Sequence, residues 1–383
     1  MSKIASVKAT LSELQMVCLS RNIAFVTYCL PDSRDILTLI QYKSQPRKLD
    51  SLSQLNSRQG FVLAPFLETE KFPVFLLEPD HIIHGREVDK DILEELKTIT
   101  VADDGFNTSH DYLYESQKAE FLQQVVAIKK EIQSGSLGKA VFSRIHIVES
   151  NDRQGVSEIF TALFTCYPTA FRYVLNIRGA GCWIGASPEP LMEVRDNIVE
   201  TVSLAGTQKL NGTPAGKVEW QSKEMEEQRF VTAYIESHLN DFGITGYLKR
   251  GPFSQQAANL VHLKSTFSFD RDSLGENLGE FISALHPTPS VCGWPKAEAF
   301  GLIRHLEKHE RGYYSGFLGP INIDGRINLY VNLRCMLVLQ RQFALFAGAG
   351  ITSGSNPEKE WEETELKMQT LLSVLRNMDT KNG

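Results

Sequence analysis

Apolar and polar residues recur with two different periods along the chain, and each period predicts one kind of element. Between residues 112 and 134 apolar side chains return at helical spacing, with lysine and glutamate between them, and Gly135 ends the pattern. Residues 137–147 then alternate between two faces and are rich in β-branched side chains, which is typical of a strand. In such a strand Lys139 points to the same face as Val141. The chain therefore mixes amphipathic helices with strands.

The remaining segments extend this pattern. Short apolar runs predict strands at residues 24–28, 60–64, 171–176, 182–185, 261–265, 313–319, 329–335 and 343–346. Helical spacing predicts helices at residues 90–96, from 222 onward, at 280–285, at 300–307 and after residue 357. We find no internal repeat or low-complexity tract, so one large α+β domain is expected.

The N-terminal residues 1–110 contain no arrangement of side chains that suggests catalysis. Residues 101–110 have the polar composition of a connection. We therefore distinguish an N-terminal part, residues 1–110, from residues 111–383, which carry the candidate chemistry.

Composition narrows the class of protein. The 383 residues are 42% hydrophobic and 22% charged, which suits a packed globular core. The formal net charge of −6 argues against a nucleic-acid partner or an acidic membrane surface, because both bind basic faces. No apolar run approaches the ~20 residues of a membrane span, and the N-terminus lacks a signal-peptide core. The six cysteines form no C-x-x-C pair, so we expect neither a zinc site nor disulfides, and a reduced, cytoplasmic location.

The stretch from residue 343 to residue 367 carries the first candidate chemistry. A buried strand is predicted first, and Gly348 and Gly350 directly after it permit a sharp turn or a close approach to a ligand. A helix then begins, with Ser355 or Asn356 as its cap and Pro357 in its first turn. One face of this helix carries Glu360, Glu363 and Lys367, which are spaced at i, i+3 and i+7.

Two interpretations of this helix face are open on the residues alone. A solvated face with a Glu363–Lys367 ion pair would contribute only ~0.3–0.5 kcal/mol, and most such pairs are surface features. Alternatively, two carboxylates and an ammonium beside a glycine-rich strand hold a hard cation together with an anionic ligand.

The stretch closely resembles the C-terminal signature of the chorismate-utilising enzymes, the family of isochorismate, salicylate, anthranilate and aminodeoxychorismate synthases. The strongest match is residues 286–295, His-Pro-Thr-Pro-Ser-Val-Cys-Gly-Trp-Pro, which are similar to the family's His-Pro-Thr-Pro-Ala-x-x-Gly-x-Pro motif. The resemblance is continuous from residue 112 to residue 375. It implies a fold of two antiparallel sheets packed against each other, with helices outside them and the active site in the cleft.

The resemblance assigns a general base and a general acid. Lys139 begins a Lys-Ala-Val-Phe-Ser-Arg strand similar to the family's Lys-Val-Val-Leu-Ser-Arg. This lysine is the base in water-using members, whereas ammonia-using members have glutamine there. Pro188 cannot donate a hydrogen bond to a neighbouring strand, so the strand is expected to break or bulge just before Glu189. Glu189 stands in a Ser-Pro-Glu motif whose glutamate is the family's general acid. Without the resemblance, Lys139 would be interpreted as an edge charge and Glu189 as an exposed turn residue.

Two pairs of glutamates are the implied metal ligands. By resemblance, Mg²⁺ is held by Glu227 and Glu363, with Glu224 and Glu360 supporting them directly or through water. Glu224 and Glu227 lie in a segment similar to the family's Lys-Asp-x-x-Glu-His. This chain departs from that segment twice, with Glu224 in place of aspartate and Gln228 in place of histidine, so the role of the imidazole is not carried over. The alternative is an ordinary charged helix surface.

The family's contacts with its substrate have counterparts as well. They include a Leu-Ala-Gly-Thr loop whose backbone amides contact a carboxylate, and a histidine near the substrate ring. They also include an arginine whose fork suits the enolpyruvyl carboxylate. The substrate-binding residues implied here are Gly206, Thr207, His262, Ser290, Tyr314, Arg334, Gly348 and Lys367.

The resemblance as a whole predicts an Mg²⁺-dependent isochorismate synthase, an isomerase. Lys139 would activate water for attack on C2 of chorismate, and Glu189 would protonate the departing C4 hydroxyl. The alternatives are a salicylate synthase, which goes on to eliminate pyruvate, and a catalytically silent member that only binds a ligand or partner. Because residue 139 is lysine, we expect no glutaminase subunit. We also expect the protein to be a monomer. A menaquinone pathway and a siderophore pathway are both open.

Overall fold

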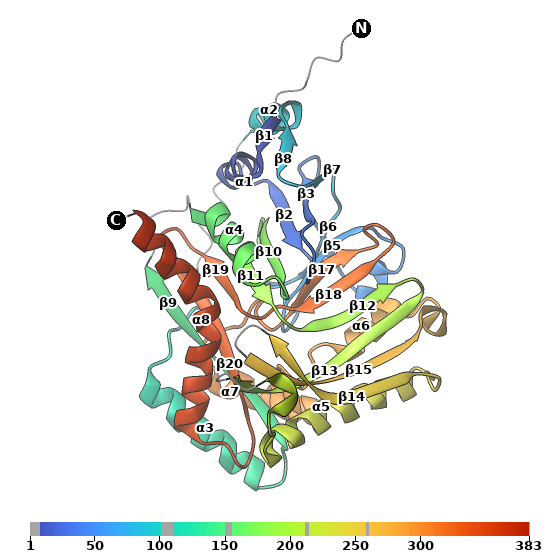
Figure 1. Ribbon diagram of the computed structural model, residues 1–383, viewed down its shortest axis with the longest axis vertical. Helices are drawn as coiled ribbons and strands as arrows, with labels where there is room; N and C mark the ends of the chain where they lie inside the picture. Colours follow the sequence, from blue (N-terminus) through green and yellow to red (C-terminus); the bar gives the residue numbers. More distant parts are fainter. Residues whose placement is uncertain (1–7, 101–109, 150–154, 211–213, 258–259, 383) are drawn as a thin grey trace.

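In the part of the chain that the structure describes, two nine-stranded antiparallel sheets form the framework (Figure 1). Each large sheet combines N-terminal strands with strands from the rest of the chain, and a third, two-stranded sheet pairs β1 (Lys8–Thr10) with β8 (Glu87–Asp89). The predicted fold of two packed antiparallel sheets is therefore confirmed. The structure is a computed structural model, and it describes residues 8–100, 110–149, 155–210, 214–257 and 260–382.

The first sheet carries Lys139 and the glycine-rich strand side by side. Its strands in spatial order are β16 (Gly293–Trp294), β9 (Lys139–Glu149), β20 (Gln342–Ile351), β19 (Cys335–Val338), β11 (Gly181–Ser187), β10 (Phe171–Ile177), β2 (Ala24–Cys29), β3 (Ile36–Gln41) and β7 (His81–His84). The register of β9 and β20 pairs Val141 with Gly350 and Ser143 with Gly348. The two glycines therefore lie beside the strand that begins at Lys139.

The second sheet carries Gly206 and His262 on neighbouring strands. Its strands in spatial order are β14 (Leu248–Ala257), β15 (Leu260–Asp270), β13 (Ile198–Lys209), β12 (Pro190–Arg195), β18 (Ile327–Val331), β17 (Phe317–Ile321), β5 (Gly60–Ala64), β6 (Val74–Leu77) and β4 (Arg47–Leu49). The register of β13 and β15 shifts between Ala205 and Thr207, and Gly206 at the shift has a φ of +65°. Glycine adopts this left-handed conformation without strain, which makes the bulge possible.

Helices cover the outer faces of both sheets. In the described residues they are α1 (Leu11–Ser20), α2 (Lys90–Thr98), α3 (Lys118–Gln133), α4 (Val156–Cys166), α5 (Ser222–Asp241), α6 (Leu278–Leu285), α7 (Lys296–Leu306) and α8 (Pro357–Asn382). Helices α1, α2, α4 and α8 share a core with the first sheet, and α5 and α6 share one with the second. Helices α3 and α7 pack around the ends of β9 and β20. None of the described helices is long and apolar enough to cross a membrane.

An aromatic layer fills the space between the two sheets. Phe171 of the first sheet stacks on Tyr330 of the second with ring centroids 4.4 Å apart and an interplanar angle of 7°. Tyr28 and Phe61 contact Phe171 from the same two sheets. The interior strands are buried on both faces because this layer covers one face and the helices cover the other. This explains why their sequences are apolar runs without clear alternation.

The structure corrects four predicted element boundaries. The chain from Tyr112 to Gln117 is not helical, because α3 begins only at Lys118. Residues 313–316 form a turn before β17, and Cys335 belongs to β19 rather than to the paired strand β18. The predicted strand end at Phe346 is also wrong, because β20 runs through both glycines to Ile351.

The aromatic layer generates a stability prediction. Phe171→Ala should lower the free energy of unfolding by ~3–5 kcal/mol, because its side chain is 0% exposed and the cavity left behind would not be refilled. The matched control is Phe253→Ala on β14, where the side chain is 43% exposed and the expected change is within about 0.5 kcal/mol. Urea unfolding followed by fluorescence measures both. Equal losses in the two variants would contradict the role of the layer.

Candidate active site

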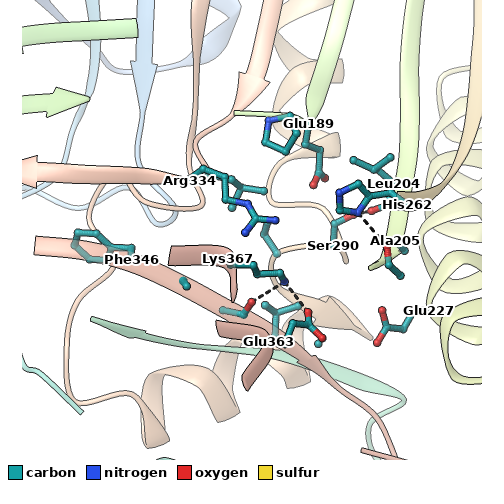
Figure 2. Close-up of a pocket in the computed structure, with 18 of the residues that line it drawn as sticks. Glu189, Leu204, Ala205, Glu227, His262, Ser290, Arg334, Phe346, Glu363 and Lys367 are labelled. Atoms are coloured by element: carbon teal, nitrogen blue, oxygen red, sulfur yellow. Dashed lines mark hydrogen bonds and ion pairs between the residues drawn. The ribbon is translucent and has the colours of Figure 1, made fainter. Parts of the chain in front are cut away.

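A pocket opens where the two sheets meet helices α5 and α8 (Figure 2). Most of the site residues predicted from the sequence lie around it. Those lining the pocket are Lys139, Glu189, Gly206, Glu227, His262, Ser290, Tyr314, Arg334, Gly348, Glu363 and Lys367. Glu224 and Glu360 are not part of its lining, and the side chain of Thr207 lies outside the described residues.

Lys139 lies at the start of β9, where its side chain is 2% exposed. Its Nζ is 3.9 Å from Oε2 of Glu227 on α5. Burial lowers the pKa of Lys139, and the nearby Glu227 carboxylate opposes this shift only in part. A side chain at Gly350 would bring its Cβ to 2.9 Å from Cε of Lys139, so the lysine would have to move from its present position. The lysine is thus held in a site that favours its neutral form.

Glu189 lies in the short break between β11 and β12 that Pro188 was expected to cause. The carboxyl group is buried and points into the pocket (Figure 2). Burial raises the pKa of Glu189 to about 7, against the opposing effects of a hydrogen bond from Ser290 and the Lys139 ammonium. A large fraction of this group is therefore protonated at neutral pH, as an acid catalyst requires.

Arg334 brings a buried guanidinium into the same pocket. It follows β18 with a φ of +49°, a backbone conformation that is rare for a non-glycine residue. Its Nη1 is buried, and it has no hydrogen-bond partner among the residues that the structure describes. Burial lowers the pKa of Arg334 to about 10, so the group is still cationic at neutral pH. A buried cation without a partner is suited to an anionic ligand.

Lys367 of α8 supplies a second cation to the pocket. Its Nζ donates to the carbonyl of Gly348 at 2.8 Å and pairs with Oε1 of Glu363 at 2.7 Å. The ammonium groups of Lys367 and Lys223 outweigh the effect of burial and hold the pKa of Glu363 below its usual range. The Glu363–Lys367 ion pair predicted from helical spacing is therefore present, but both residues line a pocket instead of lying on an exposed helix surface.

Glu227 and Glu363 face the pocket from two different helices and offer the carboxylate oxygens that a hard cation prefers. Glu360 is buried behind them, and its Oε2 has no hydrogen-bond partner in the described part of the chain. Glu224 points elsewhere, because its Oε2 accepts a hydrogen bond of 3.0 Å from the amide of Gln221 at the start of α5. No group of three metal-binding side chains is gathered among the described residues. This donor set fits a cation that keeps water or substrate oxygens as its remaining ligands.

Lys223 is a site residue that sequence reasoning missed. Its Nζ lies 2.5 Å from Oε1 of Glu360 and 4.0 Å from Oε1 of Glu227, so it connects α5 with α8. These carboxylates overcome the effect of burial and raise the pKa of Lys223 above its usual value. Its position four residues before Glu227 was the only signal in the sequence, and such spacing is common on exposed helices.

Two further residues hold the pocket wall in place. Gln228, which replaces the family's histidine, donates to the carbonyl of Ser203 at 3.2 Å and to the hydroxyl of Ser265 at 3.0 Å. It therefore faces the second sheet and anchors α5 there. The Nδ1 of His262 lies 3.1 Å from the carbonyl oxygen of Gly206, and burial lowers the pKa of this histidine to about 4, so the imidazole is neutral at physiological pH.

Comparison with known proteins gives relatives of more than one activity. Over 262 residues the chain is 29% identical to the vibriobactin-specific isochorismate synthase of Vibrio cholerae, covering 67% of this chain and 66% of that protein. Over 268 residues it is 28% identical to anthranilate synthase component 1 of Acetivibrio thermocellus, covering 67% of this chain and 53% of that protein. The matched region thus spans about two thirds of the first relative and about half of the second.

A solved structure agrees with the fold. The putative 2,3-dihydroxybenzoate-specific isochorismate synthase DhbC of Bacillus anthracis superposes with a TM-score of 0.74 at 21% identity, covering 95% of this chain and 99% of that one. The family model described as chorismate binding enzyme matches residues 78–376, which is well over half of the chain. The resemblance found in the sequence is therefore confirmed, and this chain belongs to the chorismate-binding enzyme family.

Proposed function

We propose that this chain is an isochorismate synthase, an isomerase that adds water at C2 of chorismate and releases the C4 hydroxyl as water. One observation carries the proposal. A buried lysine with a lowered pKa and a buried glutamic acid with a pKa of about 7 line the same pocket. The isochorismate synthases among its relatives support the same activity.

The proton transfers balance within this pair. Neutral Lys139 accepts a proton from water as the water oxygen bonds to C2. Protonated Glu189 donates a proton to the C4 oxygen as the C4–O bond breaks, so one water enters and one leaves. Exchange with solvent then restores both groups. Since ammonia-using members have glutamine where this chain has Lys139, water is the nucleophile and no glutaminase subunit is required.

The cationic groups of the pocket suit the two carboxylates of chorismate. Arg334, with its unpaired Nη1, would bind the enolpyruvyl carboxylate. Tyr314 lies beside this position and stacks on Phe346 with ring centroids 5.2 Å apart, which gives the wall a flat aromatic surface. The amide of Gly206 at the strand bulge would contact a carboxylate as well.

Mg²⁺ completes the proposed site. Glu227 and Glu363 would hold the ion, and Glu360 would support it directly or through water. Glu224, the fourth glutamate expected here, caps the start of α5 instead. When bound, the ion supplies positive charge that offsets the ring carboxylate of the substrate. The unpaired oxygen of Glu360 supports this assignment, because a buried carboxylate oxygen without a donor is satisfied by a cation or its water.

The product identifies the reaction. With chorismate, Mg²⁺ and water, the wild type should form isochorismate, and Lys139→Ala and Glu189→Gln should each lower kcat by ~10²–10⁴-fold because a positioned base or acid is lost. Chromatography measures isochorismate, and coupling to lactate dehydrogenase measures pyruvate. Stoichiometric pyruvate would favour a salicylate synthase. Amino products formed with ammonium salts, or wild-type kcat in Lys139→Ala, would contradict the assigned nucleophile and base.

The pKa of Glu189 sets a limit on activity at high pH. Since Glu189 must be protonated and its pKa is about 7, kcat/KM should fall by about tenfold per pH unit well above that value. On the acid side kcat/KM should fall as Lys139 becomes charged, at a pH below the usual lysine pKa. Incubation at each pH followed by assay at neutral pH separates titration from denaturation. A kcat/KM that still rises above pH ~9 would exclude Glu189 as the acid.

Metal binding is tested by calorimetry as well as by turnover. Glu227→Gln and Glu363→Gln should each weaken Mg²⁺ binding and remove nearly all activity, because each removes one negative ligand. Glu365→Gln is the control, since Glu365 lies on the same helix but pairs with Arg144 instead of lining the pocket. Full wild-type activity in excess chelator, or unchanged Mg²⁺ affinity in both variants, would contradict the metal site.

A further inference from the structure

A buried ion pair behind the pocket has no part in the function proposed above. It consists of Glu307, directly after α7, and Arg311, whose side chains are 3% and 2% exposed. Arg311 donates from Nε to Oε2 of Glu307 at 2.8 Å and from Nη2 to Oε1 at 2.6 Å, as in a bidentate pair. Oε1 of Glu307 also accepts from the amide and the hydroxyl of Ser143, at 2.7 and 2.8 Å. The carboxylate thus joins the end of α7 to β9.

The guanidinium of Arg311 reaches two segments of the pocket wall. Nη1 donates to the carbonyl of Val291 at 2.7 Å, and Nη2 donates to the carbonyl of Val141 at 2.7 Å. Both valines line the pocket. Val141 lies on β9 two residues after Lys139, and Val291 directly follows Ser290. Arg311 therefore ties the strand of the proposed base to the loop that carries Ser290.

Ser290 extends this connection to the proposed acid. Its hydroxyl donates to the carbonyl of Leu204 at 3.1 Å. The hydroxyl has one proton, and when it donates to Glu189 in place of Leu204 the hydrogen bond lowers the pKa of Glu189 against the effect of burial. A shift of the loop would therefore change the surroundings of Glu189, and a shift of β9 would move Lys139.

We propose that Glu307 and Arg311 are positioning residues that fix the placement of Lys139 relative to Glu189 by holding two backbone carbonyls of the pocket wall. The inference rests on the isochorismate synthase function proposed above. Neither residue lines the pocket, so neither touches the substrate. Their effect on rate would come from geometry, because a displacement of ~1 Å between reacting groups costs up to ~10²-fold.

Packing alone does not require an ion pair at this place. Replacing a buried ion pair by well-packed apolar side chains of similar volume is often neutral or stabilising. Such a replacement would fill the space but would remove the donors to Val141 and Val291. Only the planar fork of arginine supplies donors to a carboxylate and to two separate carbonyls at once. The hydrogen bonds, and not the volume, are what distinguish this pair.

The test compares the steady-state kinetics of the wild type with the apolar double variant Glu307→Met/Arg311→Met and with Glu307→Gln and Arg311→Lys. We expect kcat of the double variant to fall by ~10–100-fold. The KM for chorismate should change by less than about threefold, because Arg334 and Lys367 lie on other elements. Arg311→Lys keeps the charge and some of the donors, so its kcat should lie between those of the wild type and the double variant.

Arg172 offers a matched control. It is 1% exposed and donates to the carbonyls of Phe164 and Leu30, at 3.3 and 2.5 Å, and neither of these residues lines the pocket. Arg172→Met should therefore keep wild-type kcat even where its Tm falls as far as that of the Arg311 variants. Thermal unfolding of every variant shows which are folded and how far each Tm has fallen.

Three results overturn one proposal or the other. The positioning role would be overturned if the double variant folds and keeps wild-type kcat. If the double variant does not fold, wild-type kcat in both Arg311→Lys and Glu307→Gln would overturn it. An equal loss of kcat in Arg172→Met at matched Tm would also overturn it, because the loss would then follow stability. A wild type that does not convert chorismate to isochorismate would instead overturn the proposed function.

Discussion

Burial of opposite charges in one pocket is the constraint on which this site depends. Removing a lysine and a glutamate from water disfavours the charged form of each, so the pKa of Lys139 falls and that of Glu189 rises. A close ion pair between them would reverse both shifts and leave neither group able to exchange a proton with a substrate. The chain instead places the Lys139 ammonium 3.9 Å from Glu227 and carries Glu189 at the break between β11 and β12.

The two-sheet architecture provides this separation. Lys139 comes from the first sheet, while Gly206 and His262 come from the second, and α5 and α8 close the pocket with their carboxylates. The sheets are held at a fixed spacing by the aromatic layer between them, in which Phe171 and Tyr330 stack. Packing that is remote from the pocket therefore determines how far apart its charged groups lie.

The sequence predicted best those features that depend on residues close to one another along the chain. Pro188 was expected to end a strand, and β11 does end just before it. Asn356 was a candidate cap for α8, and its side chain accepts a hydrogen bond from the amide of Lys359 at the helix start. The glycines of β20 led to a wrong strand end, because Gly350 makes room for a lysine more than two hundred residues away and not for a turn. Lys223 was missed for the same reason, since its partner lies on another helix. Contacts of this kind leave no local spacing in the sequence.

The described N-terminal part, residues 8–100, contributes no residue to the pocket lining, yet it completes both large sheets. Strand β2 pairs with β10, and β5 pairs with β17. A fragment that kept only the chemistry-bearing residues would leave two interior strands with bare backbone edges, which recruit other chains and promote aggregation. The need to cover these strand edges therefore sets the shortest fragment that stays soluble. That fragment is much longer than the segment that carries the reactive side chains.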